Sequence, residues 1–309
     1  MKIAVLCGGV STEREVSLKS GDAVKQGLID AGYDVFLLDV TSISAFLEEW
    51  AKRRADGVFV AFHGGWGEDG RLQAALEANG IPYTGSGPKA CMEAMDKELS
   101  RKLFEKAGIP VPPGVTMSYD QRHDLGEAIE RWGKIVIKPA SGGSTVGVSI
   151  TSNGDEGRDA LIRIWDIDRK AVVEKFIPGR ELTVAVFGNG SSAFAMPAIE
   201  MRPHSGFYDY ASKYTSGATE YICPAQLTPE ATTRIAEYAR TAHVALNCRT
   251  YSRVDFRLDE RGDLYALELN TAPGMTATSL VPKAAAAYGW DFPRLLSEIV
   301  KDSFAKHLG

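Results

Sequence analysis

The first 62 residues alternate between short apolar runs and one long stretch with helical spacing, and this alternation restricts the fold more than any other feature. The apolar runs at 2–7, 35–39 and 58–62 predict buried strands, and the small or apolar positions between 14 and 30 predict a helix. Crossovers of this kind are right-handed and join parallel strands. We therefore expect an α/β domain with a parallel sheet, whose ligands bind at the carboxyl ends of the strands.

The remainder of the chain departs from this pattern. Asp96 is a candidate N-cap for a helix that ends near residue 107, and the proline-rich residues 109–114 then require an extended crossing. A length of 309 residues allows two or three domains, and we place boundaries after residues 95 and 180. Beyond residue 107 we expect helices at 120–132, 155–165 and 228–246, strands at 134–138, 171–176, 181–188, 194–201, 251–259 and 264–270, and a loop at 203–219.

The composition argues against several classes of protein. The 35 Lys and Arg against 40 Asp and Glu give a net charge of -5 with no basic block, which argues against nucleic acid as a partner. No apolar run approaches the roughly 18 residues that span a bilayer, and the first apolar run is too short for a signal peptide. The four cysteines lack CxxC spacing and a nearby histidine. We expect a cytoplasmic protein with reduced thiols, to which we assign no chemistry.

Two predicted strands near the C-terminus carry polar side chains on one face. Alternation places Arg253 with Asp255, and Glu268 with Asn270, opposite the apolar residues of each strand. If the turn between the strands contains four residues, Asp255 lies across from Glu268 and Arg253 lies across from Asn270. Opposed carboxylates repel each other unless a cation binds, and three oxygen ligands suit Mg²⁺ at a nucleotide site. The alternative is the solvated outer face of an edge hairpin.

A glycine-rich loop follows the predicted strand at 134–138. Residues 138–147 contain three glycines, whose backbone N–H groups are able to fold over an anion while Lys138 adds a positive charge. This pattern suits a flap over phosphates, although a plain hairpin turn also explains it. The first turn, at residues 7–11, lacks the third glycine of the GxGxxG pattern, so it gives little support to a dinucleotide-binding dehydrogenase.

Four further positions are candidate ligand contacts. Glu15, near the start of the first helix, suits a cationic group, although acids there are commonly partners of the helix dipole. His63 follows a buried strand, where it either contacts a ligand or is a hydrogen-bonded structural residue. Residues 208–214 interleave aromatic and charged side chains, as in a lid or a surface loop. The amide of Gly274, in the turn after Asn270, suits an oxyanion or belongs to a plain turn.

Several segments taken together resemble the D-alanine:D-alanine ligase family of ATP-grasp enzymes. They are residues 8–17, 63–64, 67–70, 82–87, 95–97, 138–147, 208–214 and 268–282. The resemblance implies an N-terminal parallel α/β domain over 1–95 and two α+β domains, a central one over 96–180 and a C-terminal one over 181–309, which enclose ATP. Phe176 stands where many members carry tryptophan, and Ser141-Gly142 replaces a frequent charged pair.

The resemblance also implies roles for individual residues. The implied ATP-binding residues are Lys97, Lys138, Ser144, Glu174, Lys175, Phe176, Ile177, Glu181 and Lys213. Two Mg²⁺ or Mn²⁺ ions would bind Asp255, Glu268 and Asn270. The first D-alanine would bind Glu15, which connects through Ser144 to Tyr214, and the oxyanion would bind Arg253 and the Gly274 amide. The remaining substrate contacts would come from His63, Tyr208, Ser279 and Leu280, the last two at the carboxylate of the second D-alanine.

The implied reaction joins two D-alanines into D-alanyl-D-alanine through an acylphosphate, at the expense of ATP, for peptidoglycan and cell wall synthesis. The resemblance also implies a homodimer. Three alternatives stay open: a ligase that takes D-lactate or another acid, a nucleotide-binding regulatory module without turnover, and a dehydrogenase. Tyr214 favours the dipeptide product, and a regulatory binder would not need the oxyanion and metal groups together.

Overall fold

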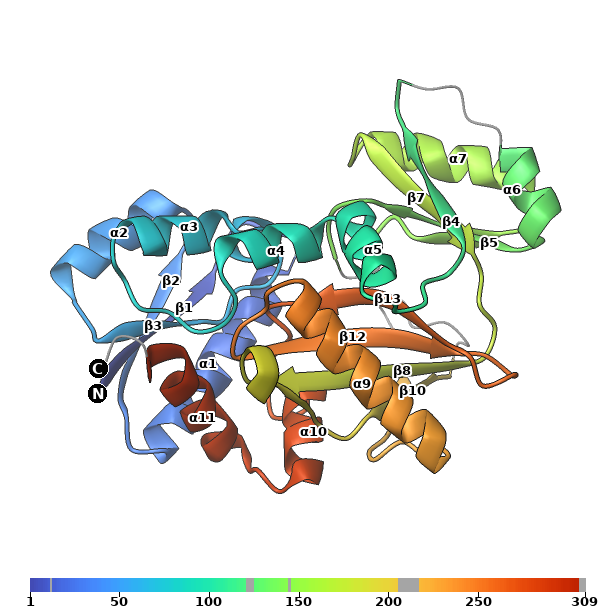
Figure 1. Cartoon of the computed structure of the whole chain (residues 1–309). Coiled ribbons are helices and arrows are strands. Elements are labelled where there is room, and N and C mark those ends of the chain that lie inside the picture. Colours follow the sequence, from blue (N-terminus) through green and yellow to red (C-terminus); the bar gives the residue numbers. More distant parts are fainter. Residues whose placement is uncertain (12, 121–124, 144–145, 205–216, 306–309) are drawn as a thin grey trace.

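Three β-sheets follow one another along the chain (Figure 1). The computed structural model describes residues 1–11, 13–120, 125–143, 146–204 and 217–305. The first sheet is parallel, as the strand–helix alternation predicted, and its order is β2–β1–β3. Its elements are β1 (Lys2–Gly8), α1 (Arg14–Asp30), β2 (Asp34–Val40), α2 (Ile43–Lys52) and β3 (Gly57–Val60), followed by η1 (Gly65–Gly67), α3 (Arg71–Ala78) and α4 (Pro88–Met95).

Helices α2 and α4 were not predicted from the sequence. Ser42 caps α2 by accepting a hydrogen bond from the Ala45 amide, and Pro88 is the first residue of α4. Both are ordinary signals for the start of a helix, but each helix has only 8 to 10 residues. Two turns of helix leave too short a periodic pattern to stand out in the sequence.

The central sheet is antiparallel, with the order β4–β7–β5–β6. Its elements are β4 (Gly114–Ser118), α6 (Leu125–Trp132), β5 (Ile135–Pro139), β6 (Ser149–Thr151), α7 (Gly154–Trp165) and β7 (Lys170–Lys175). Ile135 and Ile137 of β5 and Ile164 of α7 are fully buried in one apolar cluster between the sheet and its two helices. β5 and β6 pair directly, so the glycine-rich loop is the turn of a hairpin.

The C-terminal sheet has the order β11–β10–β8–β12–β13, and β9 pairs with β8. Its strands are β8 (Arg180–Phe187), β9 (Phe194–Ala195), β10 (Ile199–Pro203), β11 (Thr219–Ile222), β12 (Tyr251–Leu258) and β13 (Leu264–Asn270), with η2 (Gly190–Ser192) before β9. The single strand expected at 194–201 is wrong: β9 and β10 are separate. Pro197 lies between them, and proline has no N–H to donate to a ladder. α9 (Pro229–Ala245) begins at the Thr228 cap, as predicted.

The β12–β13 register agrees with the prediction, but its premise was wrong. The turn contains five residues rather than four, because Leu258 pairs with Leu264. A β-bulge between Asp255 and Phe256 then shifts the register by one residue, so that Asp255 lies across from Glu268 as expected. The extra residue on β13 is Leu267. The longer turn and the bulge offset each other, so the predicted pairing of Asp255 with Glu268 is correct.

Helix α5 (Lys97–Lys106) joins the central sheet to the C-terminal sheet. It begins at Asp96, whose carboxylate accepts hydrogen bonds from the Glu98 and Leu99 amides, as the predicted N-cap requires. Figure 1 shows α5 between the central sheet and β13. Phe104 of α5 is fully buried in the apolar cluster that α9 forms with β8, β12 and β13. α5 is therefore anchored on the C-terminal sheet.

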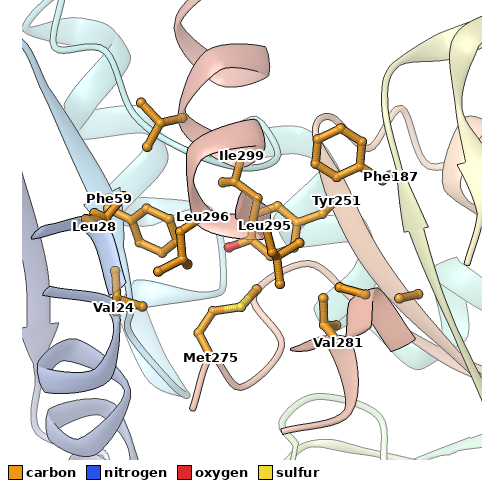
Figure 2. Packing of buried hydrophobic residues seen from close by; sticks show 14 of the residues in the cluster. Val24, Leu28, Phe59, Phe187, Tyr251, Met275, Val281, Leu295, Leu296 and Ile299 are labelled. Atoms are coloured by element: carbon orange, nitrogen blue, oxygen red, sulfur yellow. The ribbon is translucent and has the colours of Figure 1, made fainter. Parts of the chain in front are cut away.

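The last two helices are α10 (Leu280–Tyr288) and α11 (Phe292–Phe304). In Figure 2, Leu295 and Leu296 of α11 lie between Leu28 of the first helix and Tyr251 of β12. The N-terminal and C-terminal sheets thus share one apolar core. The domain boundaries after residues 95 and 180 stay a prediction. No helix in the described part of the chain is long and apolar enough to cross a membrane.

His243 of α9 is a buried titratable group. Its Nδ1 lies 2.8 Å from the Ser252 hydroxyl and its Nε2 lies 3.1 Å from the Gly188 carbonyl oxygen. Burial lowers the pKa of His243 from 6.5 to about 4, against smaller raising effects from the Gly188 hydrogen bond and Asp302. The unfolded chain therefore binds a proton at higher pH than the folded chain does. The neutral ring contributes its full stability above about pH 6.5 and loses it as the pH falls toward 4.

We predict that this histidine lowers the free energy of unfolding by on the order of 3 kcal/mol between pH 7 and pH 4. Urea unfolding at several pH values measures the effect. A His243→Gln variant should be less stable at pH 7 and should show a shallower loss of stability over this range. Equal pH slopes in the two proteins would contradict the prediction.

Candidate functional site

A cavity that is open to solvent lies between the central and C-terminal sheets. The walls come from β5, β6 and β7 on one side and from β8, β12 and β13 on the other. The predicted ATP-binding residues that line the cavity are Lys97, Lys138, residues 174–177 and Glu181, together with the predicted metal ligands Asp255 and Glu268.

The buried carboxylate of Glu174 anchors Lys138 in this cavity. Lys138 Nζ donates to Glu174 Oε1 at 2.6 Å, and Arg101 Nη1 donates to Glu174 Oε2 at 2.7 Å. Arg101 also donates to the Pro112 carbonyl oxygen at 2.8 Å. All three charged side chains are at least nine-tenths buried. Glu174, expected at the adenine, thus also holds Lys138 in place.

The base of the glycine-rich loop is held by Lys97 and Asp168. The Lys97 amide donates to the Ala140 carbonyl at 2.8 Å, and its Nζ donates to the Gly142 carbonyl at 2.5 Å. Gly142 has a φ of +94°, a conformation that L side chains rarely adopt. Asp168 accepts a hydrogen bond from the Ser141 amide at 2.7 Å. Lys97 therefore connects the start of α5 directly to this loop.

The hairpin of β12 and β13 presents the carboxylate oxygens of Asp255 and Glu268 at one end of the cavity. Asp255 is held from two sides: Arg253 donates to both of its oxygens at 2.8 and 2.9 Å, and the Thr183 hydroxyl donates to Oδ1 at 2.5 Å. Asn270 Oδ1 accepts from the Ala272 amide and has a second lone pair.

The described residues contain no group of three His, Cys, Asp or Glu side chains suited to a metal ion. The predicted metal ligands Asp255, Glu268 and Asn270 are two carboxylates and one amide, which all offer oxygen donors. Glu268 and Asn270 also line a second cavity next to the first. Oxygen donors are the ligands that Mg²⁺ prefers, with water and phosphate oxygens completing its coordination. The residues present therefore fit Mg²⁺.

The adjoining cavity reaches from the metal-ligand candidates to the N-terminal domain. Glu68 lines it, as do Glu268 and Asn270. Glu68 Oε1 lies 3.5 Å from His63 Nδ1, and His63 Nε2 lies 2.8 Å from the Ser20 hydroxyl. His63 is buried, and both of its ring nitrogens face protein groups, so its contact with a substrate stays a prediction.

Cys91 also lines this second cavity, but its position does not make it reactive. Burial raises the pKa of the Cys91 thiol to about 12. A neutral thiol is a poor nucleophile, because the thiolate is the reactive form. All four cysteines are free.

The turn after β13 leads into the N-terminus of α10. Met275 is buried in the shared core, which fixes the turn next to Gly274 (Figure 2). Ser279 is the N-cap residue of α10, and its hydroxyl accepts from the Thr276 amide at 3.1 Å. The first amides of α10, including that of Leu280, have no partner within the helix, so this end of α10 favours an anionic group.

The other predicted substrate residues are only partly described. Glu15 is exposed in the first turn of α1. Ser144, Tyr208, Lys213 and Tyr214 lie outside the described residues. The predicted flap and lid therefore stay predictions.

Several residues of the site were not predicted from the sequence. Arg101 lies four residues after Lys97 on α5, a spacing that places both on one helix face. Glu68 belongs to one of the segments that carried the resemblance, but it had no role assigned. Thr183 gave no local signal, because its contact with Asp255 depends on the pairing of β8 with β12.

Comparisons with known proteins agree with this architecture. The family described as D-ala D-ala ligase C-terminus matches residues 103–301, and the one described as D-ala D-ala ligase N-terminus matches residues 41–86. The D-alanine–D-alanine ligase of Carboxydothermus hydrogenoformans is 42% identical over 306 residues, which cover 97% of each chain.

Two solved structures are similar over nearly the whole chain. The D-alanine–D-alanine ligase of Bacillus anthracis complexed with ATP has a TM-score of 0.87 at 32% identity and covers 100% of both chains. The VanG D-Ala:D-Ser ligase of Enterococcus faecalis has a TM-score of 0.83 at 30% identity and covers 98% of this chain and 99% of its own. From the family matches and the full-length similarity, we conclude that the chain belongs to the D-alanine–D-alanine ligase family.

Proposed function

We propose that this protein joins two D-alanines into D-alanyl-D-alanine, with ATP converted to ADP and phosphate, for the synthesis of peptidoglycan precursors. The observation that carries the proposal is the continuity of the two cavities. The larger cavity holds the lysines and acids suited to a nucleoside triphosphate. The smaller cavity leads from Glu268 and Asn270 toward the N-terminal domain. Lys97 and Glu268 line both cavities.

In the first step, a carboxylate oxygen of the first D-alanine attacks the γ-phosphorus of ATP, and the bond to the β–γ bridging oxygen breaks to release ADP. Lys97 and Lys138 neutralise phosphate charge, and Glu181 binds the ribose. Bound Mg²⁺, held by Asp255, Glu268 and Asn270, would supply further charge neutralisation. Glu15 binds the ammonium group of the first D-alanine. The product of this step is an acylphosphate.

In the second step, the neutral amine of the second D-alanine attacks the acylphosphate carbonyl carbon, and phosphate leaves. The N-terminus of α10, with Ser279 and Leu280, binds the second carboxylate. Arg253 and the Gly274 amide stabilise the oxyanion of the tetrahedral intermediate. Water must be excluded because an acylphosphate hydrolyses readily, which is the function of the loop at 141–147 when it covers the cavity.

Further properties extend the same proposal. We assign the protein to the cytoplasm and to a homodimer. The three domains have the bounds 1–95, 96–180 and 181–309. Mn²⁺ replaces Mg²⁺ in the same oxygen-donor set, because both ions accept oxygen ligands.

The experiment that tests the proposal is ADP and phosphate release from Mg-ATP with D-alanine, with L-alanine, or with D-alanine plus D-lactate or D-serine, with the product identified by mass. We expect release that depends on D-alanine and yields D-alanyl-D-alanine. Release only with D-lactate or D-serine would assign a different second substrate. No release under any condition would contradict the ligase proposal.

We predict that Arg253→Gln lowers kcat by about 100-fold or more, because the side chain acts on the tetrahedral intermediate. The KM for ATP should change by only a few-fold, since the proposed contact forms after ATP binds. Steady-state kinetics measures both constants. Turnover close to that of the parent would remove Arg253 from the mechanism.

A control separates this role from the hold that Arg253 has on Asp255. Thr183→Val removes the other hydrogen bond to Asp255 while Arg253 stays in place. We expect it to lower kcat much less than Arg253→Gln does. Equal losses in the two variants would mean that Arg253 acts mainly by positioning Asp255.

We also predict that Asp255→Asn raises the Mg²⁺ concentration for half-maximal activity by about tenfold or more, because even indirect support of a metal ligand is commonly worth 10–100-fold in affinity. Titration of Mg²⁺ at saturating ATP measures it. Glu181→Gln, which changes another carboxylate of the same cavity, should raise the KM for ATP and leave the Mg²⁺ dependence unchanged. Unchanged Mg²⁺ dependence in Asp255→Asn would exclude it as a metal ligand.

A further inference from the structure

Arg257 lines the larger cavity and has no role in the reaction described above. It lies on β12 two residues after Asp255, so both side chains are on the same face of the strand. Only 15% of its side chain is exposed. A long charged side chain with so little exposure needs specific partners, because burying an unpaired charge is costly.

The guanidinium of Arg257 has partners in three directions. Nη1 donates to Glu181 Oε2 at 3.0 Å, and Nε donates to the Ile177 carbonyl oxygen at 3.0 Å. The guanidinium carbon lies 5.5 Å from the centre of the Phe176 ring. The planar fork of arginine makes such divergent contacts from one rigid group, whereas lysine offers a single point charge.

These contacts join parts of the chain that belong to different sheets. Phe176 and Ile177 belong to the connection between β7 of the central sheet and β8 of the C-terminal sheet, and Glu181 lies near the start of β8. Arg257 fixes this connection to β12. The backbone on which the adenine is proposed to rest, and the carboxylate proposed for the ribose, are thereby held by one side chain.

We propose that Arg257 is a positioning residue for the nucleoside half of ATP. It holds the Glu181 carboxylate where it accepts hydrogen bonds from the ribose hydroxyls, and it holds the Ile177 peptide against the adenine. It also balances the charge of Glu181, which otherwise repels the phosphates in the same cavity. The inference rests on the proposed function, because it takes ATP as the ligand.

This role differs from a general contribution to stability. Arg257 contacts the connection at 176–177 and Glu181, and none of these contacts involves a candidate metal ligand or a residue proposed to bind D-alanine. Its removal should therefore weaken nucleotide binding while leaving the chemical step and the D-alanine contacts intact. A purely structural arginine would instead affect all substrates together, or only the stability of the protein.

The test uses the full chain with Arg257→Met, which keeps an unbranched apolar stem and removes the hydrogen-bond donors. Arg257→Lys keeps the charge without the fork. The matched control is Arg294→Met, because Arg294 is an exposed arginine on α11 that packs over the Trp290 ring, 5.5 Å from its centre and outside both cavities. Calorimetric titration with Mg-ADP and with Mg-2′-deoxy-ADP measures binding without turnover.

We expect Arg257→Met to weaken Mg-ADP binding by about tenfold, as the loss of hydrogen bonds to a charged group predicts, with Arg257→Lys intermediate. The preference for ADP over 2′-deoxy-ADP should fall, because Glu181 is no longer held at the ribose. In kinetics, the KM for ATP should rise while kcat and the KM for D-alanine stay within about twofold. Arg294→Met should bind both nucleotides as the parent does.

Two results would overturn the inference. One is Mg-ADP binding by Arg257→Met within about twofold of the parent protein. The other is an ADP to 2′-deoxy-ADP preference that is the same in the parent and in Arg257→Met. Both are read against a parent protein that binds ADP and makes the dipeptide. A parent that does neither contradicts the proposed function itself, so the two failures are distinguishable.

Discussion

The buried carboxylate of Glu174 is the interaction on which the geometry of the nucleotide cavity depends. A charge with so little contact with water is stable only when it is paired, and here Lys138 and Arg101 pair with one oxygen each. Lys138 and Glu174 belong to the central sheet, whereas Arg101 belongs to α5, which Phe104 anchors on the C-terminal sheet. These ion pairs therefore position Lys138 in the cavity, and they hold the central sheet against the C-terminal sheet.

This arrangement explains which parts of the site the sequence was able to predict. Strand alternation was enough to place Arg253, Asp255 and Glu268 on one face, because side-chain direction in a strand is a local property. The register of the hairpin was predicted for an incorrect reason. The five-residue turn and the bulge at Leu267 offset each other, and neither has a strong local signal. Local patterns therefore predicted the faces of the strands better than the course of the backbone between them.

The features that sequence analysis missed depend on contacts between distant segments. The strands of the N-terminal sheet were predicted well, since strands buried on both faces are continuous apolar runs in the sequence, although the crossover helix α2 was missed. The return of α11 to pack on the first helix has no counterpart in local periodicity, although Leu295 and Leu296 fill the shared core. The same dependence on contacts between distant segments applies to Arg101, Thr183 and Arg257. Their partners are fixed only when two sheets, or two strands far apart in the chain, have come together.

The proposed reaction must take place where the two cavities meet. Lys97, Glu268 and the glycines at 142–143 line both of them, so these groups are the ones that face the nucleotide side and the amino acid side at once. Lys97 spans this junction from a helix that is fixed to the C-terminal sheet, and its amine binds the loop that leads from the central sheet. A phosphoryl group passing from ATP to a D-alanine carboxylate moves through this junction in the proposed mechanism. The position of α5 therefore couples the central sheet to the chemical step as well as to the nucleotide.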